Sequence, residues 1–180
     1  AVKYLRPWVK KKKAWAQQNL ASMYDRGFGV KQSYEMARRL YELAAEQGYA
    51  GAMCNLGVLY DNGQGVEQSY ERSKAYYEQA AHLGYAKAQY NLGVMYKNGL
   101  GVEQSYEAAA QLYEQAAQQG HTSAMYNLGV MYYYNGDGVV QSYERAKKYY
   151  EQAAHLGYVQ AQTNLGCMYA NGEGVERDMV

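Results

Sequence analysis

The sequence predicts an all-α protein, a solenoid of stacked antiparallel helix pairs, and three observations lead to this prediction. The composition is that of a segment copied several times, with 23 tyrosines but one phenylalanine and 19 glycines but one proline among 180 residues. Apolar and small residues recur at the helical spacing within each copy. Asn-Leu pairs mark the copies at steps of 36 or 37 residues, beginning at Asn19, Asn55, Asn91, Asn127 and Asn164. Repeats of this length are typical of proteins in which each helix pair stacks on the next.

The Asn-Leu markers, and Gly-Val pairs that follow at the same spacing, divide one solenoid domain into units. Four units are complete, at 14–49, 50–85, 86–121 and 122–158, and partial units flank them at 1–13 and 159–180. The unit 122–158 is one residue longer than the others, because an extra residue stands in the run Tyr132-Tyr133-Tyr134.

The partial unit 1–13 aligns with the second helix of a pair. Ala1, Tyr4, Leu5 and Trp8 then take core positions. Pro7 falls inside this segment, and proline in a helix interior removes a backbone hydrogen bond. We therefore expect a kinked or frayed helix here. At the other end, residues 174–180 are expected to enter a further second helix.

The first helix of each complete unit is predicted from a stripe of residues on one helical face. In the third unit these are Ala88, Leu92, Gly93 and Tyr96. Asn98-Gly99 then fits a helix stop, with glycine in the left-handed conformation after the last turn. The same pair recurs at Asn62-Gly63, Asn135-Gly136 and Asn171-Gly172.

The second helix is predicted to begin at the motif Gln-Ser-Tyr-Glu, which occurs four times. Ser105 of the third unit is a natural helix cap, because its hydroxyl can accept a hydrogen bond from an amide of the first turn. Glu107 lies near the positive end of the helix dipole. Glycines are expected to end these helices, at Gly48, Gly84, Gly120 and Gly157.

Glycine also stands in the middle of four first helices, where it costs about 1 kcal/mol relative to alanine. These glycines are Gly57, Gly93, Gly129 and Gly166. We expect a close approach of the second helix to compensate for the cost. Alanine pairs offer a smooth surface for it, at Ala80-Ala81, Ala116-Ala117 and Ala153-Ala154, with tyrosines such as Tyr96 filling the wider gaps.

The repeat reads Ala-x-x-x-Leu-Gly-x-x-Tyr-x-x-Gly-x-Gly-Val, followed by a cap, an aromatic residue and Ala-Ala-x-x-Gly. This pattern resembles the Sel-1-like repeat family, a branch of the tetratricopeptide-like helical repeats, and is clearest in 88–120 and 124–157. The resemblance implies a right-handed superhelix whose first helices line a concave face. It also implies a non-enzymatic role as an adaptor or scaffold for protein complexes, with no cofactor.

Residues suited to catalysis or metal binding are sparse. His82 and His155 share one repeat position and His121 follows Gly120, and none has a carboxylate or cysteine at the spacing of a catalytic triad or metal site. The histidines are expected to be surface or capping residues. Two distant cysteines do not form a disulfide framework or a zinc motif. We therefore expect no enzyme activity, no metal and no cofactor.

Charge is distributed unevenly along the chain. Six basic residues and no acid stand in 1–13, which leaves 12 basic against 17 acidic residues in the remainder. This balance argues against a nucleic-acid groove. The run Lys10 to Lys13 has two interpretations, a patch for nuclear import or an acidic partner, and a solvated helix end.

The sequence shows no membrane-spanning stretch, no signal peptide, no glycosylation acceptor and no disulfide pattern. These features favour a cytoplasmic location.

The surface of the first helices opposite the core stripe is the candidate protein-binding site. Asparagine recurs there, and its amide offers a donor and an acceptor to a peptide backbone, while tyrosine adds stiff contact area. Alternatively, the asparagines bond the adjacent hairpin. Cys54 is also placed at an exposed position. The candidate residues on the concave face are Asn55, Lys87, Tyr90, Asn91, Lys97, Tyr126, Asn127, Tyr133 and Asn164.

The sequence thus predicts a scaffold that holds a segment of a partner protein. The alternative is a structural spacer in a longer repeat array, without a groove ligand and tolerant of substitution on this surface. A hydrolase would need a convergent cluster of polar residues, and an RNA-reading repeat would need variable residues where this chain is nearly constant. Self-association through the partial terminal repeats is a further expectation, because the helix expected at 159–171 has no second helix to cover it.

Overall fold

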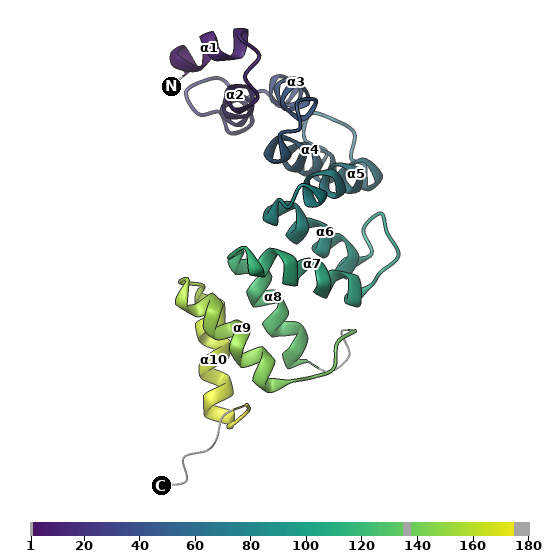
Figure 1. The fold of residues 1–180 in the computed structure, drawn as a ribbon, viewed down its shortest axis with the longest axis vertical. Coiled ribbons are helices and arrows are strands. Elements are labelled where there is room, and N and C mark those ends of the chain that lie inside the picture. Colours follow the sequence, from purple (N-terminus) through teal and green to yellow (C-terminus); the bar gives the residue numbers. More distant parts are fainter. Residues whose placement is uncertain (1, 135–137, 175–180) are drawn as a thin grey trace. The chain divides into compact units, whose positions relative to one another are not determined.

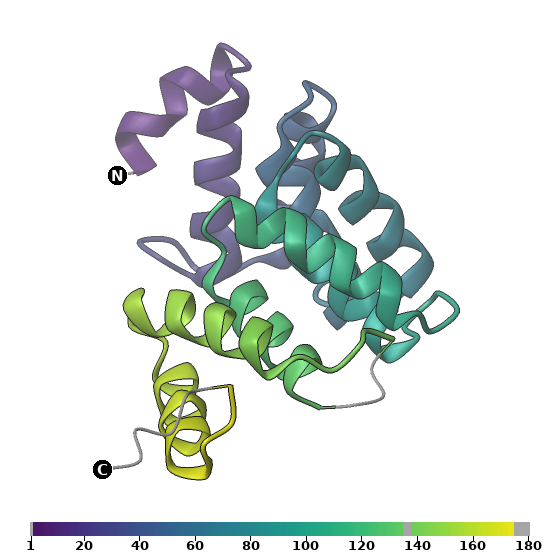
Figure 2. The same cartoon turned by 60° about the horizontal axis from the view of Figure 1, so that its bottom comes forward.

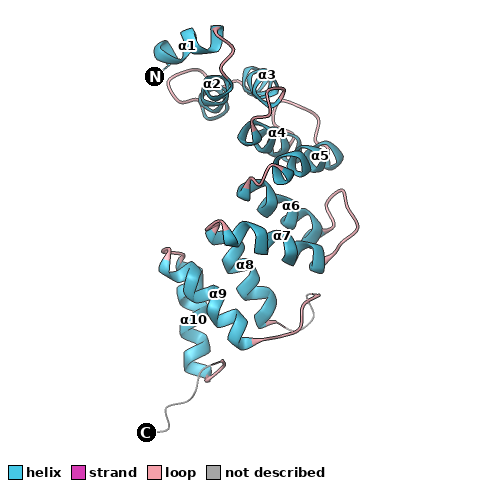
Figure 3. Ribbon diagram, in the orientation of Figure 1, coloured by secondary structure: helices cyan, strands magenta, loops and turns pink. Residues whose placement is uncertain are grey.

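The computed structural model describes residues 2–134 and 138–174, and every regular element in this part of the chain is a helix (Figure 3). The helices are α1 (Val2–Lys10), α2 (Ala14–Arg26), α3 (Tyr34–Ala45), α4 (Ala50–Asn62), α5 (Tyr70–His82), α6 (Ala86–Asn98), α7 (Tyr106–Gln118), α8 (Thr122–Tyr133), α9 (Tyr143–His155) and α10 (Val159–Asn171). The predicted all-α class, with stacked helix pairs, is confirmed. None of the described helices is long and apolar enough to cross a membrane.

The chain forms two compact units, residues 1–88 and 89–180, and α6 spans the boundary between them. In the first unit each helix from α1 to α5 packs on the next (Figure 1). In the second unit α7 packs on α8, α8 on α9 and α9 on α10, which remain neighbours in the turned view of Figure 2. Contacts between successive helices are the packing expected of a repeat protein.

Three predictions concern residues outside the described ranges. They are Ala1 at a core position, the helix stop at Asn135-Gly136, and the further second helix expected in 174–180, of which only Gly174 is described.

Helix α1 packs only partly through the residues predicted, because Leu5 packs on the core but Tyr4 and Trp8 do not. Tyr4 and Trp8, expected in the core, are 82% and 43% exposed. The helix runs from Val2 to Lys10 with Pro7 inside it. The residues that pack on the core of the first unit are Val2, Leu5 and Val9. These aliphatic positions share one helical face, so they determine which side of α1 is buried.

The predicted caps of the second helices are confirmed. Ser105 Oγ accepts a hydrogen bond from the amide of Ala108 at 3.2 Å, and its equivalents do the same at the start of α3, α5 and α9. Glycines after the helices adopt the left-handed conformation that was predicted, with φ of 65° at Gly63 and 80° at Gly48. A serine cap stabilises a helix by about 1 kcal/mol relative to alanine.

The glutamine of each Gln-Ser-Tyr-Glu motif joins the two helices of a pair, a role that was not predicted. Gln104 Nε2 donates to the carbonyl oxygen of Lys97 in the last turn of α6, at 2.8 Å, and also contacts the Tyr106 hydroxyl. Equivalent bonds are made by Gln32, Gln68 and Gln141. Carbonyl groups at a helix end lack partners within the helix, so the motif satisfies one of them while serine caps the next helix.

Three of the four mid-helix glycines, those of α4, α6 and α8, face tyrosine rings and not the alanine pairs that were predicted. A Cβ placed on Gly93 would lie 2.7 Å from Cε1 of Tyr113. A Cβ placed on Gly57 or Gly129 would likewise lie too close to the ring of Tyr77 or Tyr150, respectively. These second-helix tyrosines are fully buried and are Tyr41, Tyr77, Tyr113 and Tyr150. The glycine provides the space for the ring, and burial of the ring offsets the low helix propensity of glycine.

The extra residue of the long unit changes how its first helix ends. Helices α4, α6 and α10 end at asparagine, but α8 ends one position earlier in the repeat, at Tyr133. Tyr134 then takes an extended conformation, with φ of −92° and ψ of 131°. The inserted residue is therefore accommodated after the end of α8, and the side chain of Tyr134 lies on the surface of the second unit.

Candidate protein-binding surface

The predicted binding residues lie on first helices and are mostly half-buried. In the second unit these are Tyr90, Asn91 and Lys97 on α6, Tyr126, Asn127 and Tyr133 on α8, and Asn164 on α10. In the first unit Asn55 lies half-buried on α4, and Lys87 is exposed at the start of α6.

Tyr90 and Tyr126 are each fixed by two ring contacts. Tyr90 lies 4.6 Å from the His121 ring in a stacked arrangement and 5.7 Å from Tyr113. Tyr126 makes the corresponding contacts in the next repeat, 4.9 Å from Tyr158 and 5.9 Å from Tyr150. Each ring thus connects its own helix pair to the residue that begins the next first helix. The exposed part of both rings is held in a defined orientation.

Two of the asparagines contact the helix pair that precedes them. Burial raises the pKa of Tyr113 and of Tyr90, and the side chain of Asn127 beside both hydroxyls partly offsets the rise. Asn164 has the same effect on the pKa of Tyr150, which burial also raises. Contact with the preceding helix pair is a structural role for these asparagines, which the sequence analysis gave as the alternative to peptide binding. Within the described residues, neither the Tyr113 hydroxyl nor the Tyr150 hydroxyl makes a hydrogen bond of ordinary geometry.

Tyr133 is held by a carboxylate. Its hydroxyl donates to Glu173 Oε2 at 2.6 Å, and this hydrogen bond, followed by burial, raises the pKa of Tyr133 to about 12. The ring also contacts Tyr134 and Tyr143 edge to face, with centroids 4.9 Å and 5.4 Å away. The hydrogen bond and the two ring contacts therefore fix the position of Tyr133 from three sides.

Cys54 is fully buried and not exposed as predicted. Burial raises the pKa of its thiol to about 11, with a smaller opposing effect from Lys87. A thiol with this pKa is a poor nucleophile at neutral pH. Cys167 is exposed on α10. The two cysteines thus differ strongly in accessibility.

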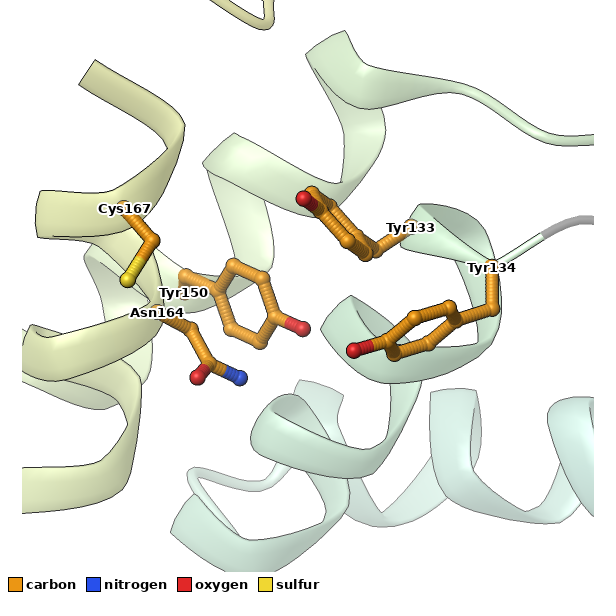
Figure 4. A pocket seen from close by; sticks show the side chains of 5 residues that line it. All are labelled: Tyr133, Tyr134, Tyr150, Asn164 and Cys167. Atoms are coloured by element: carbon orange, nitrogen blue, oxygen red, sulfur yellow. The ribbon is translucent and has the colours of Figure 1, made fainter. Parts of the chain in front are cut away.

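A pocket of about 260 Å³ opens in the second unit at the end of α8. Figure 4 shows the rings of Tyr133, Tyr134 and Tyr150 around the opening, with α10 contributing the other side. The described residues that line it are Tyr133, Tyr134, Tyr150, Asn164 and Cys167. Sequence reasoning did not select Tyr134 or Tyr150. The one-residue insertion was the available signal for Tyr134, whereas Tyr150 reads as an ordinary core position.

Second helices border other pockets. One of about 370 Å³ in the second unit includes Glu114, Gln118 and Tyr149, and one of about 420 Å³ in the first unit includes Glu42, Glu46 and Tyr76. These grooves between successive second helices are the main competing surfaces for a partner.

The histidines are placed as predicted. His82 and His155 are exposed at helix ends, and His121 caps α8 by accepting from the amide of Ala124 through Nδ1 at 3.3 Å. Among the residues that the structure describes, no group of three His, Cys, Asp or Glu side chains could hold a metal ion.

These stacked helix pairs, with glycine-tyrosine packing and capped second helices, define a helical-repeat protein of the solenoid class. The sequence model of the Sel1 repeat matches residues 16–49, 50–85, 86–121, 122–158 and 159–180. The chain therefore belongs to the Sel1 repeat family, whose members are generally protein-interaction scaffolds. A comparison with curated proteins gave no match.

Solved structures agree with this assignment. A Sel1 repeat protein from Oxalobacter formigenes is 35% identical, with a TM-score of 0.84 over 93% of this chain and 66% of its own. The protective antigen c5321 of uropathogenic Escherichia coli, which has the same repeat fold, is 37% identical, with a TM-score of 0.92 over 99% of this chain and 38% of its own. This chain thus spans only part of either relative. The immunity protein PA5088 from Pseudomonas aeruginosa, 23% identical with a TM-score of 0.62, shares the fold.

Proposed function

We propose that this protein is a non-enzymatic scaffold that binds a segment of a partner protein on the surface of its first helices. In the second unit, this surface consists of the half-buried residues of α6 and α8 described above, with Asn164 on α10. In the first unit, Asn55 and Lys87 belong to the corresponding surface.

The observation that carries the proposal is the fixed, partly exposed aromatic set on α6 and α8. Tyr90 and Tyr126 are held by ring contacts at 4.6 Å and 4.9 Å, yet both remain half-buried, so they offer contact area without first losing conformational freedom. Aromatic side chains of this kind are common anchors in protein interfaces. Asn91 and Asn127 lie beside them in sequence and add polar groups suited to a peptide backbone.

Site-specific crosslinking with library peptides tests the proposal. Peptides are first selected from a random library on the immobilised chain. Benzoylphenylalanine, which crosslinks on illumination, then replaces Val94 on α6 or Val130 on α8, two half-buried first-helix positions next to the aromatic set. The selected peptides are expected to crosslink at both positions, about tenfold more than at a second-helix position, because a bound peptide contacts only one face.

Gln118 on α7 is the matched control position, because it is exposed and belongs to the competing groove of the second helices. Crosslinking at Gln118 in preference to Val94 and Val130 would move the binding site to that groove. If no peptide is enriched, or all positions crosslink equally, the proposal is wrong and the spacer interpretation is favoured.

Self-association through the terminal partial repeats is a separate proposal. On α10, Val159 and Tyr169 are 66% and 51% exposed, and burial of such groups against a second copy would be favourable. Sedimentation of the chain is then expected to show a mass that rises with concentration. A monomer at every concentration contradicts it.

A further inference from the structure

The pocket at the end of α8 is formed in part by the one-residue insertion that distinguishes this repeat from the others. The inserted Tyr134 leaves the helix in an extended conformation, and its ring forms one wall while remaining 58% exposed. Tyr133, the last residue of α8, forms the adjacent wall (Figure 4). No other unit has a residue at the inserted position. The pocket is therefore a local feature of this repeat and not a general feature of the fold.

The walls of the pocket carry polar groups that can accept hydrogen bonds from a ligand. Tyr150 is 1% exposed, and in the described part of the chain its hydroxyl makes no hydrogen bond of ordinary geometry. Asn164 lies beside it and has an amide oxygen that can accept. A ligand with several N–H groups could use both acceptors. Buried polar groups without a partner favour a ligand that supplies one.

Electrostatics favour a positive charge in this pocket. None of the described lining residues is charged, and three of these five are tyrosines, whose ring faces attract cations. The Glu173 carboxylate bonds to the hydroxyl of Tyr133, which adds negative charge at the rim. Residues 89–180 hold nine acidic against five basic residues. A cation would therefore be attracted to this unit and stabilised within the pocket.

We infer that this pocket binds the arginine side chain of a partner segment. The inference rests on the proposed scaffold function and specifies one element of the partner. A guanidinium group stacks on aromatic rings and presents five N–H donors, so it can lie against Tyr134 and donate to Asn164 and Tyr150. Arginine fits these walls better than lysine, whose ammonium is more strongly hydrated and has no planar face.

The test uses the full chain and two capped tripeptides, Gly-Arg-Gly and Gly-citrulline-Gly. Citrulline has nearly the shape of arginine but no charge, so it isolates the contribution of the cation. Binding is followed by NMR of the Asn164 side-chain amide and by the rate at which iodoacetamide alkylates Cys167, a pocket residue that is exposed. The buried Cys54 is the internal control and should not react at a comparable rate.

The arginine tripeptide is expected to shift the Asn164 amide signals and to slow alkylation of Cys167. The citrulline tripeptide should need about five times the concentration for the same effect, since cation–π contacts have modest energies in partly exposed sites. Equal binding of the two tripeptides, or binding of neither, would overturn the inference.

Substitutions locate the site. Tyr134→Leu is expected to weaken arginine binding about fivefold, whereas Tyr134→Phe keeps the ring and should bind within about twofold of the original chain. Tyr150→Phe removes one acceptor and should weaken binding. Tyr113→Phe is its matched control, because Tyr113 is as deeply buried and its hydroxyl also lacks a well-formed hydrogen bond, but it does not line the pocket. Loss of binding in Tyr113→Phe, or none in Tyr134→Leu, would place the arginine elsewhere.

The outcomes separate this inference from the proposed function. If library peptides crosslink to the first helices but the arginine tripeptide does not bind, the scaffold proposal stands and the arginine pocket is wrong. If the arginine tripeptide binds but no library peptide crosslinks there, the pocket stands as a ligand site and the proposed peptide surface is wrong.

Discussion

Replacement of Tyr113 by alanine is expected to lower the free energy of unfolding by about 3–5 kcal/mol, the usual cost of removing a large buried aromatic side chain. Tyr113 is fully buried, its ring packs on Gly93, and it lies 5.7 Å from the Tyr90 ring. Its loss would leave a cavity between α6 and α7 and remove a contact that orients Tyr90. Urea unfolding followed by circular dichroism gives the change in free energy.

The phenylalanine variant tests which part of Tyr113 provides this stability. Because the hydroxyl is buried without a well-formed hydrogen bond, Tyr113→Phe is expected to change the free energy of unfolding by less than about 1 kcal/mol, in either direction. If phenylalanine were as destabilising as alanine, the contact with Asn127 would have to be a strong hydrogen bond. The asparagine would then be mainly a structural residue.

Local signals made the fold predictable. Serine before the helices α3, α5, α7 and α9 and glycine after most helices act through their own backbone and nearest neighbours, so Ser105 and Gly63 could be assigned from the sequence. Repetition strengthened each assignment, since an ambiguous pattern in one unit recurred in the others. The Gln104 contact was missed, although it is equally regular. It joins the ends of two helices, and the sequence does not show which carbonyl group lies within reach.

Packing partners and exposure were predicted less well. The glycine in α4, α6 and α8 correctly indicated a close approach. The second helix offers both an alanine pair and a tyrosine as the partner, and the sequence pattern does not show which of the two lies against the glycine. For a related reason Cys54, predicted to be exposed, is buried, and Tyr4, predicted to be in the core, is exposed. A helical stripe gives the buried face only to within about one residue, because each position lies about 100° from the next. The neighbouring helices decide which residues at the edges of the stripe are covered.

The candidate site was predictable only where the repeat is regular. Tyr90 and Tyr126 share a repeat position, so their presence on one helix face followed from the alignment. Their ring contacts with His121 and Tyr158 did not follow from the alignment, because His121 and Tyr158 begin the next first helix. The pocket depends on the irregular part of the repeat. An inserted residue can be counted from the sequence, but the direction of the Tyr134 side chain depends on where α8 ends.

Alanine at Gly93 is expected to lower the free energy of unfolding by about 2 kcal/mol, the net result of overpacking and a gain in helix propensity. Its Cβ would lie 2.7 Å from Cε1 of Tyr113 and 3.3 Å from the carbonyl oxygen of Ala109. The ring is buried and the second contact is backbone, so neither can move freely. Urea unfolding measures the loss.

Gly166→Ala is the matched control. Gly166 occupies the same repeat position on α10, but among the described residues nothing lies within 4 Å of a Cβ placed there. The same substitution is therefore expected to raise the free energy of unfolding by up to about 1 kcal/mol, through helix propensity alone. Opposite signs at equivalent positions would show that the tyrosine ring, and not the helix itself, requires glycine. Equal losses at both positions would contradict this.

A double variant identifies the contact directly. If Tyr113 is the reason for glycine at position 93, Gly93→Ala combined with Tyr113→Leu should lose about 1 kcal/mol less than the sum of the two single losses, since residues in contact are not additive. The smaller leucine leaves room for the new methyl group, which partly fills the cavity. Strict additivity would mean that the backbone oxygen of Ala109 causes the cost at Gly93. The glycine would then be required by the approach of the two helix backbones.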